Sequence, residues 1–328
     1  MYEIPFHSQD LANYRFLVTG GAGFIGSNIV EYLLKYNAKE VRILDNLATG
    51  FFENIEIFIQ QPNCNFIQGD IRDLNTCQEA CKNIDIVLHQ AALGSVPRSI
   101  NDPITTNQVN IDGFLNMLVA VRDNNIKRMV YAASSSTYGD SQTLPKQEDI
   151  IGKPLSPYAV TKYVNELYAD VFAKTYNMEL IGLRYFNVFG QRQSHQGEYA
   201  AVIPIFMKAL TEQKSPFING DGEQTRDFTF VENAVQANIL AGFTQNVDAI
   251  NQVYNVAVGD RTSLNSLFQI IQQLANVKIE PTYRENRRGD VRDSLADISK
   301  AQKLLNYQPR IKIEEGLKKA WQSFITKK

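Results

Sequence analysis

The chain has 328 residues, of which 44% are hydrophobic and 21% charged, and its formal net charge at pH 7 is -2. This composition is typical of a globular protein with one large core or two smaller ones. The small net charge excludes a strong attraction to nucleic acid or to an anionic membrane. No apolar run approaches the ~20 residues that a spanning helix needs, and residues 1–14 are too polar for a secretory signal, so we expect a cytoplasmic protein.

Three cysteines, Cys64, Cys77 and Cys81, are odd in number and have no paired metal-ligand spacing. The chain also has only three histidines. We therefore predict reduced thiols, as in a cytosolic protein, and no metal site.

Short apolar runs alternate with amphipathic stretches through the first half of the chain. The run Arg15–Thr19 predicts a first strand, and residues 26–36 predict a helix with Ile29, Leu33 and Leu34 facing inward. Strands alternating with helices at this spacing predict a Rossmann-type, doubly wound α/β fold with a parallel sheet. Further strands are predicted at residues 41–45, 65–69, 84–90, 128–133 and 180–185.

After about residue 189 the composition changes, because glycines and Arg/Asp clusters separate shorter segments. We predict a dinucleotide-binding Rossmann domain over residues 1–189 and a smaller mixed α/β lobe over residues 190–328. The boundary is approximate, since a run at residues 253–258 could return a strand to the first sheet. A returning segment is accordingly expected near residues 225–260. Residues 1–13 carry no motif that indicates a role.

A glycine-rich turn joins the first strand to the first helix. Gly20, Gly23 and Gly26 are spaced so that the backbone can turn tightly and approach a pyrophosphate at the helix N-terminus. Asp45 follows 19 residues past Gly26, at the end of the second strand. A carboxylate there accepts hydrogen bonds from the adenosine ribose and repels a 2′-phosphate, which predicts NAD rather than NADP. Arg42 is the only cation that the sequence places nearby.

A tyrosine and a lysine lie one turn apart at a predicted helix start. Ser156 and Pro157 suit the N-cap and first helical positions, which puts Tyr158 and Lys162 on one face. A lysine ammonium and the positive end of the helix both favour the phenolate, so we expect a lowered pKa for Tyr158. Such a group can take a proton from a sugar hydroxyl while hydride leaves the same carbon.

Ser134, Ser135 and Ser136 directly follow a predicted strand. A serine hydroxyl at the carboxyl end of a strand can hydrogen-bond the reacting oxygen. A run of serines can also satisfy the backbone of a turn, and we expect this of at least one of the three.

These motifs together resemble the extended short-chain dehydrogenase/reductase superfamily, over essentially the whole chain from Tyr14. Residues 183–190, 225–228 and 287–290 resemble the UDP-hexose 4-epimerases, and most of all the bacterial UDP-N-acetylglucosamine 4-epimerases. The resemblance implies that Ser134, Tyr158 and Lys162 are catalytic, and that a UDP-sugar is the substrate of a homodimer. It implies cofactor contacts from Gly20, Gly23, Phe24, Ile25, Gly26, Asp45, Asn46, Asp70, Ile71, Gln90, Ala91, Ala92, Asn110, Tyr158 and Lys162.

The same resemblance implies a UDP site in the second lobe, where cationic and amide donors suit a diphosphate. For Arg226 and Arg287 an exposed ion pair with the adjacent Asp remains an alternative, as does a helix-capping role for Asp70. The implied substrate contacts are Gly94, Ser95, Ser134, Ser135, Tyr158, Asn187, Val202, Asn219, Arg226, Arg287, Asp290 and Ser294.

The identity of two residues bears on the reaction. Dehydratases of this superfamily resemble one another in carrying an Asp-Glu pair where this chain has Ser135 and Ser136, and decarboxylases usually carry Glu at Ser136. With dehydration and decarboxylation disfavoured, the remaining reaction is oxidation of the sugar at C4 followed by return of hydride to the other face of the sugar. Ser294 occupies the position that is Tyr in enzymes confined to UDP-galactose and UDP-glucose, and Gly94-Ser95 is also small. The sequence therefore favours UDP-N-acetylglucosamine and its C4 epimer, for surface polysaccharide synthesis.

Two rival functions remain. A UDP-uronic acid 4-epimerase or decarboxylase would need an extra cation near C6 of the sugar, which the sequence does not reveal. A non-catalytic, NAD-sensing protein of the same fold would usually lack the tyrosine or the lysine, and both are present.

Overall fold

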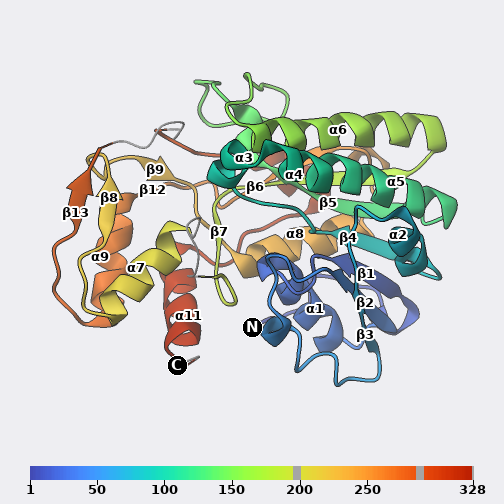
Figure 1. The fold of residues 1–328 in the computed structure, drawn as a ribbon, viewed down its shortest axis with the longest axis horizontal. Coiled ribbons are helices and arrows are strands. Elements are labelled where there is room, and N and C mark those ends of the chain that lie inside the picture. Colours follow the sequence, from blue (N-terminus) through green and yellow to red (C-terminus); the bar gives the residue numbers. More distant parts are fainter. Residues whose placement is uncertain (195–200, 286–291, 327–328) are drawn as a thin grey trace.

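The computed structural model describes residues 1–194, 201–285 and 292–326, and its centre is a seven-stranded sheet in the order β11-β6-β5-β4-β1-β2-β3 (Figure 1). All neighbouring strands in this sheet are parallel. The chain order reverses between β1 and β4, and open α/β sheets bind ligands outside the carboxyl ends of the strands at such a point. The strands are β1 (Arg15–Thr19), β2 (Glu40–Asp45), β3 (Cys64–Gln68), β4 (Ile86–His89), β5 (Arg128–Ser134), β6 (Glu179–Tyr185) and β11 (Val253–Val256).

Alternate residues of the strands face two separate hydrophobic cores, because successive side chains of a strand point to opposite faces. Phe16 and Val18 pack with α1 (Phe24–Lys35) and α8 (Val231–Phe243) on one face. Leu17 packs on the other face with α2 (Leu74–Cys81), α5 (Gly113–Asp123) and α6 (Pro157–Tyr176). The predicted doubly wound fold class is confirmed.

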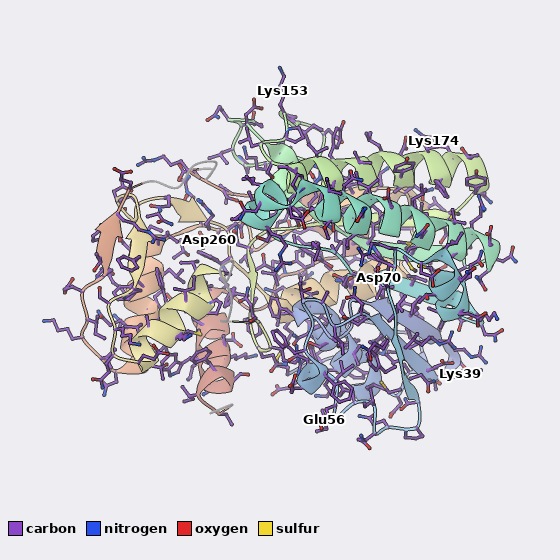
Figure 2. The ribbon with its side chains drawn as sticks, viewed as in Figure 1. Lys39, Glu56, Asp70, Lys153, Lys174 and Asp260 are labelled. Carbon is purple, nitrogen blue, oxygen red and sulfur yellow. The ribbon has the colours of Figure 1, made fainter. Side chains whose placement is uncertain are left out.

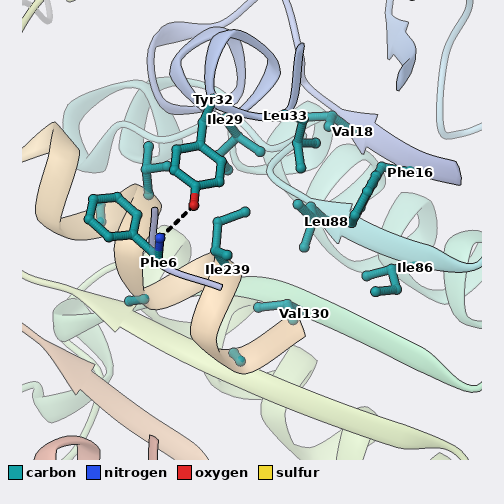
Figure 3. Packing of buried hydrophobic residues seen from close by; sticks show 14 of the residues in the cluster. Phe6, Phe16, Val18, Ile29, Tyr32, Leu33, Ile86, Leu88, Val130 and Ile239 are labelled. Carbon is teal, nitrogen blue, oxygen red and sulfur yellow. Dashed lines mark hydrogen bonds between the residues drawn. The ribbon is translucent and has the colours of Figure 1, made fainter. Parts of the chain in front are cut away.

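The N-terminal residues, for which the sequence indicated no role, cover the outer side of α1. Tyr2 is fully buried, and its hydroxyl donates to the backbone oxygen of Asn28 at 3.1 Å. Phe6 stacks on the ring of Tyr32, and its backbone N–H donates to the Tyr32 hydroxyl at 2.7 Å (Figure 3). The segment therefore extends the first core outward before β1 begins.

The second lobe has its own core between α7 (Val202–Thr211), α9 (Leu264–Ala275) and α11 (Ile313–Thr326). Figure 1 shows these helices and the small strands beside them at the opposite end of the molecule from β1–β3. The small strand pairs are β8 (Phe217–Asn219) with β13 (Thr282–Arg284), β9 (Thr225–Arg226) with β12 (Thr262–Ser263), and β7 (Val188–Phe189) with β10 (Thr229–Phe230).

Short helices complete the path of the chain. The α-helices are α3 (Val96–Asn101), α4 (Pro103–Asn107) and α10 (Ser299–Leu305), with a π-helical turn at Gln108–Asp112. Single 3-10 turns lie at Leu11–Asn13, Phe52–Asn54, Ser135–Tyr138 and Val247–Ala249. Among the described residues, no helix has both the length and the apolar character needed to cross a membrane.

The strands predicted from the sequence lie where they were expected, with ends that move by one or two residues. The fourth strand is shorter than residues 84–90, and the first helix begins at Phe24, two residues before the predicted start. β11 joins the sheet beside β6, and α8 covers the same face as α1. The second half of the chain thus contributes a strand and a helix to the first sheet.

Candidate active site

A cavity of 610 Å³ opens at the carboxyl ends of the strands of the main sheet. It is lined by residues of β2, β5 and β6, by the turns that follow β1, β2, β3 and β4, and by the starts of α1 and α6. Of the residues predicted to contact the cofactor, it brings together Gly20, Gly23, Phe24, Ile25, Gly26, Asp45, Asn46, Asp70, Ile71, Gln90, Ala91, Ala92, Tyr158 and Lys162.

The glycine-rich turn leaves no room for side chains. Gly20 has a φ of +67°, and a Cβ there would lie 2.7 Å from the backbone nitrogen of Ala91. A Cβ on Gly26 would lie 2.1 Å from the backbone oxygen of Gly20. Gly23 is the N-cap of α1 and supplies no side-chain hydrogen bond to the helix. The first backbone N–H groups of α1 can therefore donate to an anion at this edge of the cavity.

Asp45 lies at the end of β2 with its carboxylate held by the backbone. Its Oδ2 accepts from Ala22 N at 3.0 Å, and its Oδ1 accepts from Leu47 N at 2.8 Å. Burial raises the pKa of this carboxyl above its usual value, and the backbone hydrogen bonds oppose that shift. A close-fitting glycine turn beside a fixed carboxylate suits a dinucleotide without a 2′-phosphate.

The cation that lines the predicted adenine end of the cavity is Arg72 and not Arg42. Arg42 donates to Glu40 and to the backbone oxygens of Ala80 and Lys82, and it does not line the cavity. Arg72 does line it, and pairs with Asp70 at 2.7 Å. The expectation that Arg42 would be the only nearby cation was therefore wrong, since the turn after β3 folds Arg72 back over this site.

Asn110 does not line the cavity. Its Oδ1 accepts from Leu93 N at 2.8 Å, and its Nδ2 donates to the hydroxyl of Thr161 at 3.1 Å. This buried amide fixes the loop after β4 against α6. It can influence the cofactor only through the residues that it holds.

Gln90 is fixed by a closed set of hydrogen bonds at the base of the cavity. Its Nε2 donates to Asn238 at 3.0 Å, and its Oε1 accepts from the hydroxyl of Tyr185 at 3.0 Å. Asn238 in turn donates to Tyr185 at 2.7 Å. Three elements distant in sequence, β4, β6 and α8, are joined here.

The start of α6 has the capping predicted from the sequence. Ser156 is the N-cap, and its hydroxyl accepts from Ala159 N at 3.1 Å, with Pro157 as the first helical residue. The side chain of Ser134, which ends β5, lies near enough to Tyr158 to lower the pKa of its phenol. Lys162 is buried one turn further on, and its Nζ donates to the backbone oxygen of Ala132 at 2.8 Å. Ser134, Tyr158 and Lys162 thus meet at one wall of the cavity.

The sequence predicted a lowered pKa for Tyr158, and this was wrong: the groups that the structure describes leave that pKa raised. Burial raises that pKa, and the side chain of Ser134 opposes the shift only in part. Burial also lowers the pKa of Lys162 to about 8, against the attraction of Glu166. The Lys162 ammonium donates to a backbone carbonyl of β5 and not to the phenol. It therefore does not lower the pKa of Tyr158 as the sequence predicted.

A smaller cavity of 250 Å³ adjoins the first, and Ser135, Ser136 and Asn187 line both. Arg226 and Ser294 line the smaller cavity, although they follow Asn187 by 39 and 107 residues in sequence. Gly94 and Ser134 line the larger cavity only. The predicted substrate residues from β5, β6 and the second lobe therefore converge on one connected space.

Asp227 does not form the exposed pair with Arg226 that the sequence left as an alternative. Asp227 is buried, and its oxygens accept from the backbone N–H groups of Val258 and Gly259 at 2.9 and 3.1 Å. The Nη1 of Arg226 donates to the backbone oxygens of Thr225 and Arg292. Asp227 thus connects the second lobe to the backbone that follows β11. Burial raises the pKa of its carboxyl to about 6.

Among the described residues, three predicted substrate contacts do not line these cavities. Ser95 caps α3 by accepting from Arg98 N at 3.2 Å, Val202 begins α7, and Asn219 accepts from Arg284 at 2.5 Å. Arg287 and Asp290 lie outside the described residues.

Comparisons with known proteins agree with this geometry. Residues 17–320 match the family described as GDP-mannose 4,6 dehydratase. A putative UDP-glucose 4-epimerase of Methanocaldococcus jannaschii is 40% identical over 305 residues, which cover 92% of this chain and 96% of that protein. The chain belongs to the extended short-chain dehydrogenase/reductase superfamily. Within it, the UDP-hexose 4-epimerases are its relatives.

Two solved structures of this superfamily match nearly the whole chain. One is the UDP-N-acetylglucosamine 4-epimerase from Methanobrevibacter ruminantium M1 in complex with UDP-N-acetylmuramic acid, with a TM-score of 0.91, 40% identity, and coverage of 96% of this chain and 99% of that one. The other is UDP-glucuronic acid 4-epimerase from Bacillus cereus in complex with UDP-glucuronic acid and NAD, with a TM-score of 0.89, 29% identity, and coverage of 96% and 100%.

For a short-chain dehydrogenase/reductase of this type, sequence reasoning gave no individual role to several residues of the connected cavities. Tyr185 is one of them, although it belongs to the stretch 183–190 that resembles the UDP-hexose 4-epimerases, whereas Lys146 and Asp293 belong to no motif that the sequence singles out. Lys146 follows Pro145 in a loop, and Asp293 directly precedes Ser294. Inspecting the neighbours of Ser294 would have found Asp293, whereas only the fold brings Lys146 beside it.

Proposed function

We propose that the chain is a UDP-N-acetylglucosamine 4-epimerase, which interconverts UDP-N-acetylglucosamine and UDP-N-acetylgalactosamine for surface polysaccharide synthesis. The observation that carries the proposal is Ser294. This small residue lines the cavity next to Asn187 and Arg226, and that cavity adjoins the wall formed by Ser134 and Tyr158. The neighbour from Methanobrevibacter ruminantium that carries this name supports the same substrate class.

The residues that would hold NAD are those of the larger cavity. The N-terminus of α1 would face the pyrophosphate, Asp45 the adenosine ribose, and Lys162 the nicotinamide ribose. NAD held there would supply the acceptor and donor of the C4 hydride, so the reaction would have no net oxidation.

The groups of the chain supply the proton chemistry. We propose that Tyr158 accepts the proton of the C4 hydroxyl as the 4-keto sugar forms, and returns it when the opposite epimer forms. Ser134, which lines the same wall as Tyr158, would donate to the same sugar oxygen. The ammonium of Lys162 would stabilise the phenolate electrostatically once the cofactor orders the site.

Inversion requires the keto sugar to present its other face while UDP stays bound. We propose that residues 190–328 supply this anchor together with Asn187 of the first domain, with Arg226 and Asn187 on the diphosphate. We also propose that residues 1–189, with the returning segment near residues 225–260, hold NAD. Arg226 lines the smaller cavity, and a guanidinium is well suited to phosphate oxygens. Ser135 and Ser136, at the junction of the cavities, supply no carboxylic acid to expel a hydroxyl as water.

We also propose a homodimer formed through α3, α4 and α6. Exposed apolar residues follow one stripe of α6, at Val160, Leu167 and Val171, and continue on the neighbouring helices at Ile100 and Ile104. These short helices pack against α6. A patch of this kind on several adjacent helices is typical of a protein interface.

Incubation of the purified protein with UDP-N-acetylglucosamine tests the enzymatic proposal. We expect the galacto epimer to accumulate without added cofactor, and NAD to appear in the supernatant when the protein is denatured. An inactive protein that releases NAD would favour the NAD-sensing alternative, and release of NADP would contradict the role given to Asp45.

A further inference from the structure

Lys146 places a buried cation on the wall of the smaller cavity. The residue is 5% exposed, and it lines the cavity together with Ser294 and Ser136. Its backbone fixes this position, because its N–H donates to Leu295 O at 2.7 Å and its carbonyl accepts from Asp297 N at 2.9 Å. The strand-like contact with residues 295–297 thus holds Lys146 next to the segment that bears Ser294.

The ammonium of Lys146 has no carboxylate partner among the residues that the structure describes. Its Nζ donates to the backbone carbonyl of Ser141, a neutral group. Two carboxylates near Lys146 in sequence or in the cavity wall have other partners: Asp293 accepts from the hydroxyl of Thr225 at 2.6 Å, and Glu148 accepts from Asn255 N at 2.9 Å. Burial alone accounts for the lowered pKa of Lys146.

A buried ammonium without a counter-charge is costly unless an anion meets it. One carbonyl can satisfy only one of its three N–H donors. Arg226 lines the same cavity and is the better match for a diphosphate, because its planar guanidinium can bind two phosphate oxygens at once. Lys146 is therefore available for a second, smaller anionic group on the sugar side.

We propose that Lys146 binds a carboxylate on the sugar, so that the site accepts UDP-linked uronic acids in addition to sugars with a neutral C6. This inference rests on the proposed epimerase function and adds no chemical step to it. A uronic acid substrate needs an extra cation near C6 of the sugar, and the sequence motifs revealed none. Lys146 would be that cation. One structural relative holds a UDP-linked uronic acid, UDP-glucuronic acid.

Two substrates that differ only at C6 test the inference: UDP-N-acetylglucosamine and UDP-N-acetylglucosaminuronic acid. We expect the wild-type protein to epimerise both. In Lys146→Met and Lys146→Gln, the ratio of kcat/KM for the uronic acid to kcat/KM for the neutral sugar should fall about 10- to 100-fold, as expected when a charged hydrogen bond is lost. Lys146→Arg keeps the charge and should keep the ratio within a few-fold.

Two features of the design separate the outcomes. Lys146→Gln retains a donor for the Ser141 carbonyl. Lys153→Met is the control, because it removes an exposed lysine of the same loop that points into solvent (Figure 2). The ratio of the two kcat/KM values for Lys153→Met should equal that of the wild type. A wild-type enzyme that acts on the neutral sugar alone, or variants that lower both activities equally, would overturn the role of Lys146 and leave the proposed function standing. Inactivity of the wild type on both sugars would overturn the proposed function itself.

Discussion

Tyr158 and Lys162 lie where burial opposes the ionisation of both. Burial raises the pKa of the phenol and lowers that of the ammonium, and the side chain of Ser134 is the only group among those described that lowers the pKa of Tyr158. The short distance from Lys162 to the Ala132 carbonyl keeps the ammonium on β5, one turn below the phenol. The reactive state therefore depends on how substrate and cofactor complete the hydrogen bonds of these residues.

Replacement of Tyr158 by Phe should remove the proton acceptor and leave the helix intact. We expect turnover to fall by roughly 10²- to 10⁴-fold, the loss typical of a missing general base, with NAD retention unchanged. Initial rates of epimer formation and the NAD content of the purified variant measure both effects. Tyr163→Phe makes the same change on the same helix outside both cavities, so it should retain activity. Near-normal turnover of Tyr158→Phe would remove Tyr158 from the mechanism.

Ser294 offers a second test at the level of one side chain. In Ser294→Tyr a phenol ring would enter a cavity of 250 Å³, where overpacking costs ~1–3 kcal/mol. If Ser294 borders the C2 substituent, kcat/KM for UDP-N-acetylglucosamine should fall ~10-fold or more. Activity on UDP-glucose should persist or rise, because its C2 hydroxyl is smaller than an acetamide.

Measuring both sugars controls for general damage to Ser294→Tyr, which would lower the two activities together. A variant that keeps its preference for the acetylated sugar would show that Ser294 does not face C2. The assignment to N-acetylated substrates would then lose its main support.

The turn between β1 and α1 is the element in which sequence and conformation agree most closely. The glycine spacing predicted a close approach of backbone to ligand, and in the structure Gly20 adopts a φ of +67° and Gly26 contacts the oxygen of Gly20 too closely for any Cβ. The motif is local, so its geometry follows from a few consecutive residues.

Gly26→Ala should therefore distort the turn that receives the pyrophosphate. We expect the purified variant to lose most of its bound NAD and to unfold at a lower temperature, since the clash is with backbone that cannot rotate away. Gly242→Ala is the matched control. A Cβ there meets only side-chain atoms 3.8 and 3.9 Å away, within α8, and Ala should stabilise that helix by about 0.5–1 kcal/mol. NAD retention and melting temperature of Gly26→Ala equal to those of the control would contradict this account.

Elements were predictable from the sequence wherever the information is local. The strands follow from apolar runs between helical segments, and the start of α6 follows from Ser156 and Pro157. The packing of Tyr2 and Phe6 over α1 was not predictable, because scattered apolar residues in a polar segment give no periodic pattern. The smaller cavity was only partly predictable. Its lining residue Lys146 reaches Ser294 through a pairing of segments about 150 residues apart, which no spacing along the chain encodes.

At the scale of the whole molecule, the two lobes form one connected site. β11 and α8 return from the second half of the chain to the first sheet, and Asn238 on α8 hydrogen-bonds Gln90 and Tyr185 at the base of the cofactor cavity. Asp227 joins the second lobe to the end of β11 through backbone N–H groups. The segments that line the smaller cavity are thus tied directly to the sheet that carries Ser134.

The exposed apolar residues of α4 and α6 allow a test of the proposed dimer. Val171 is 55% exposed on α6 and Ile104 is 70% exposed on α4, although the opposite sides of these helices pack into the protein. In a symmetric dimer the same patch of each subunit would cover the other. Wild-type protein should therefore show the mass of a dimer by light scattering after size-exclusion chromatography.

Replacement of Leu167 and Val171 together by Glu should yield monomers, because an interface would have to bury two unpaired carboxylates in each subunit. Both side chains are exposed in the subunit, so its fold and far-ultraviolet circular dichroism should not change. Val247→Glu is the control, since Val247 is 77% exposed on a 3-10 turn outside α3, α4 and α6, and this variant should remain dimeric. A double variant that keeps the dimer mass, or a wild-type protein that is monomeric, would show that this apolar stripe is not the interface.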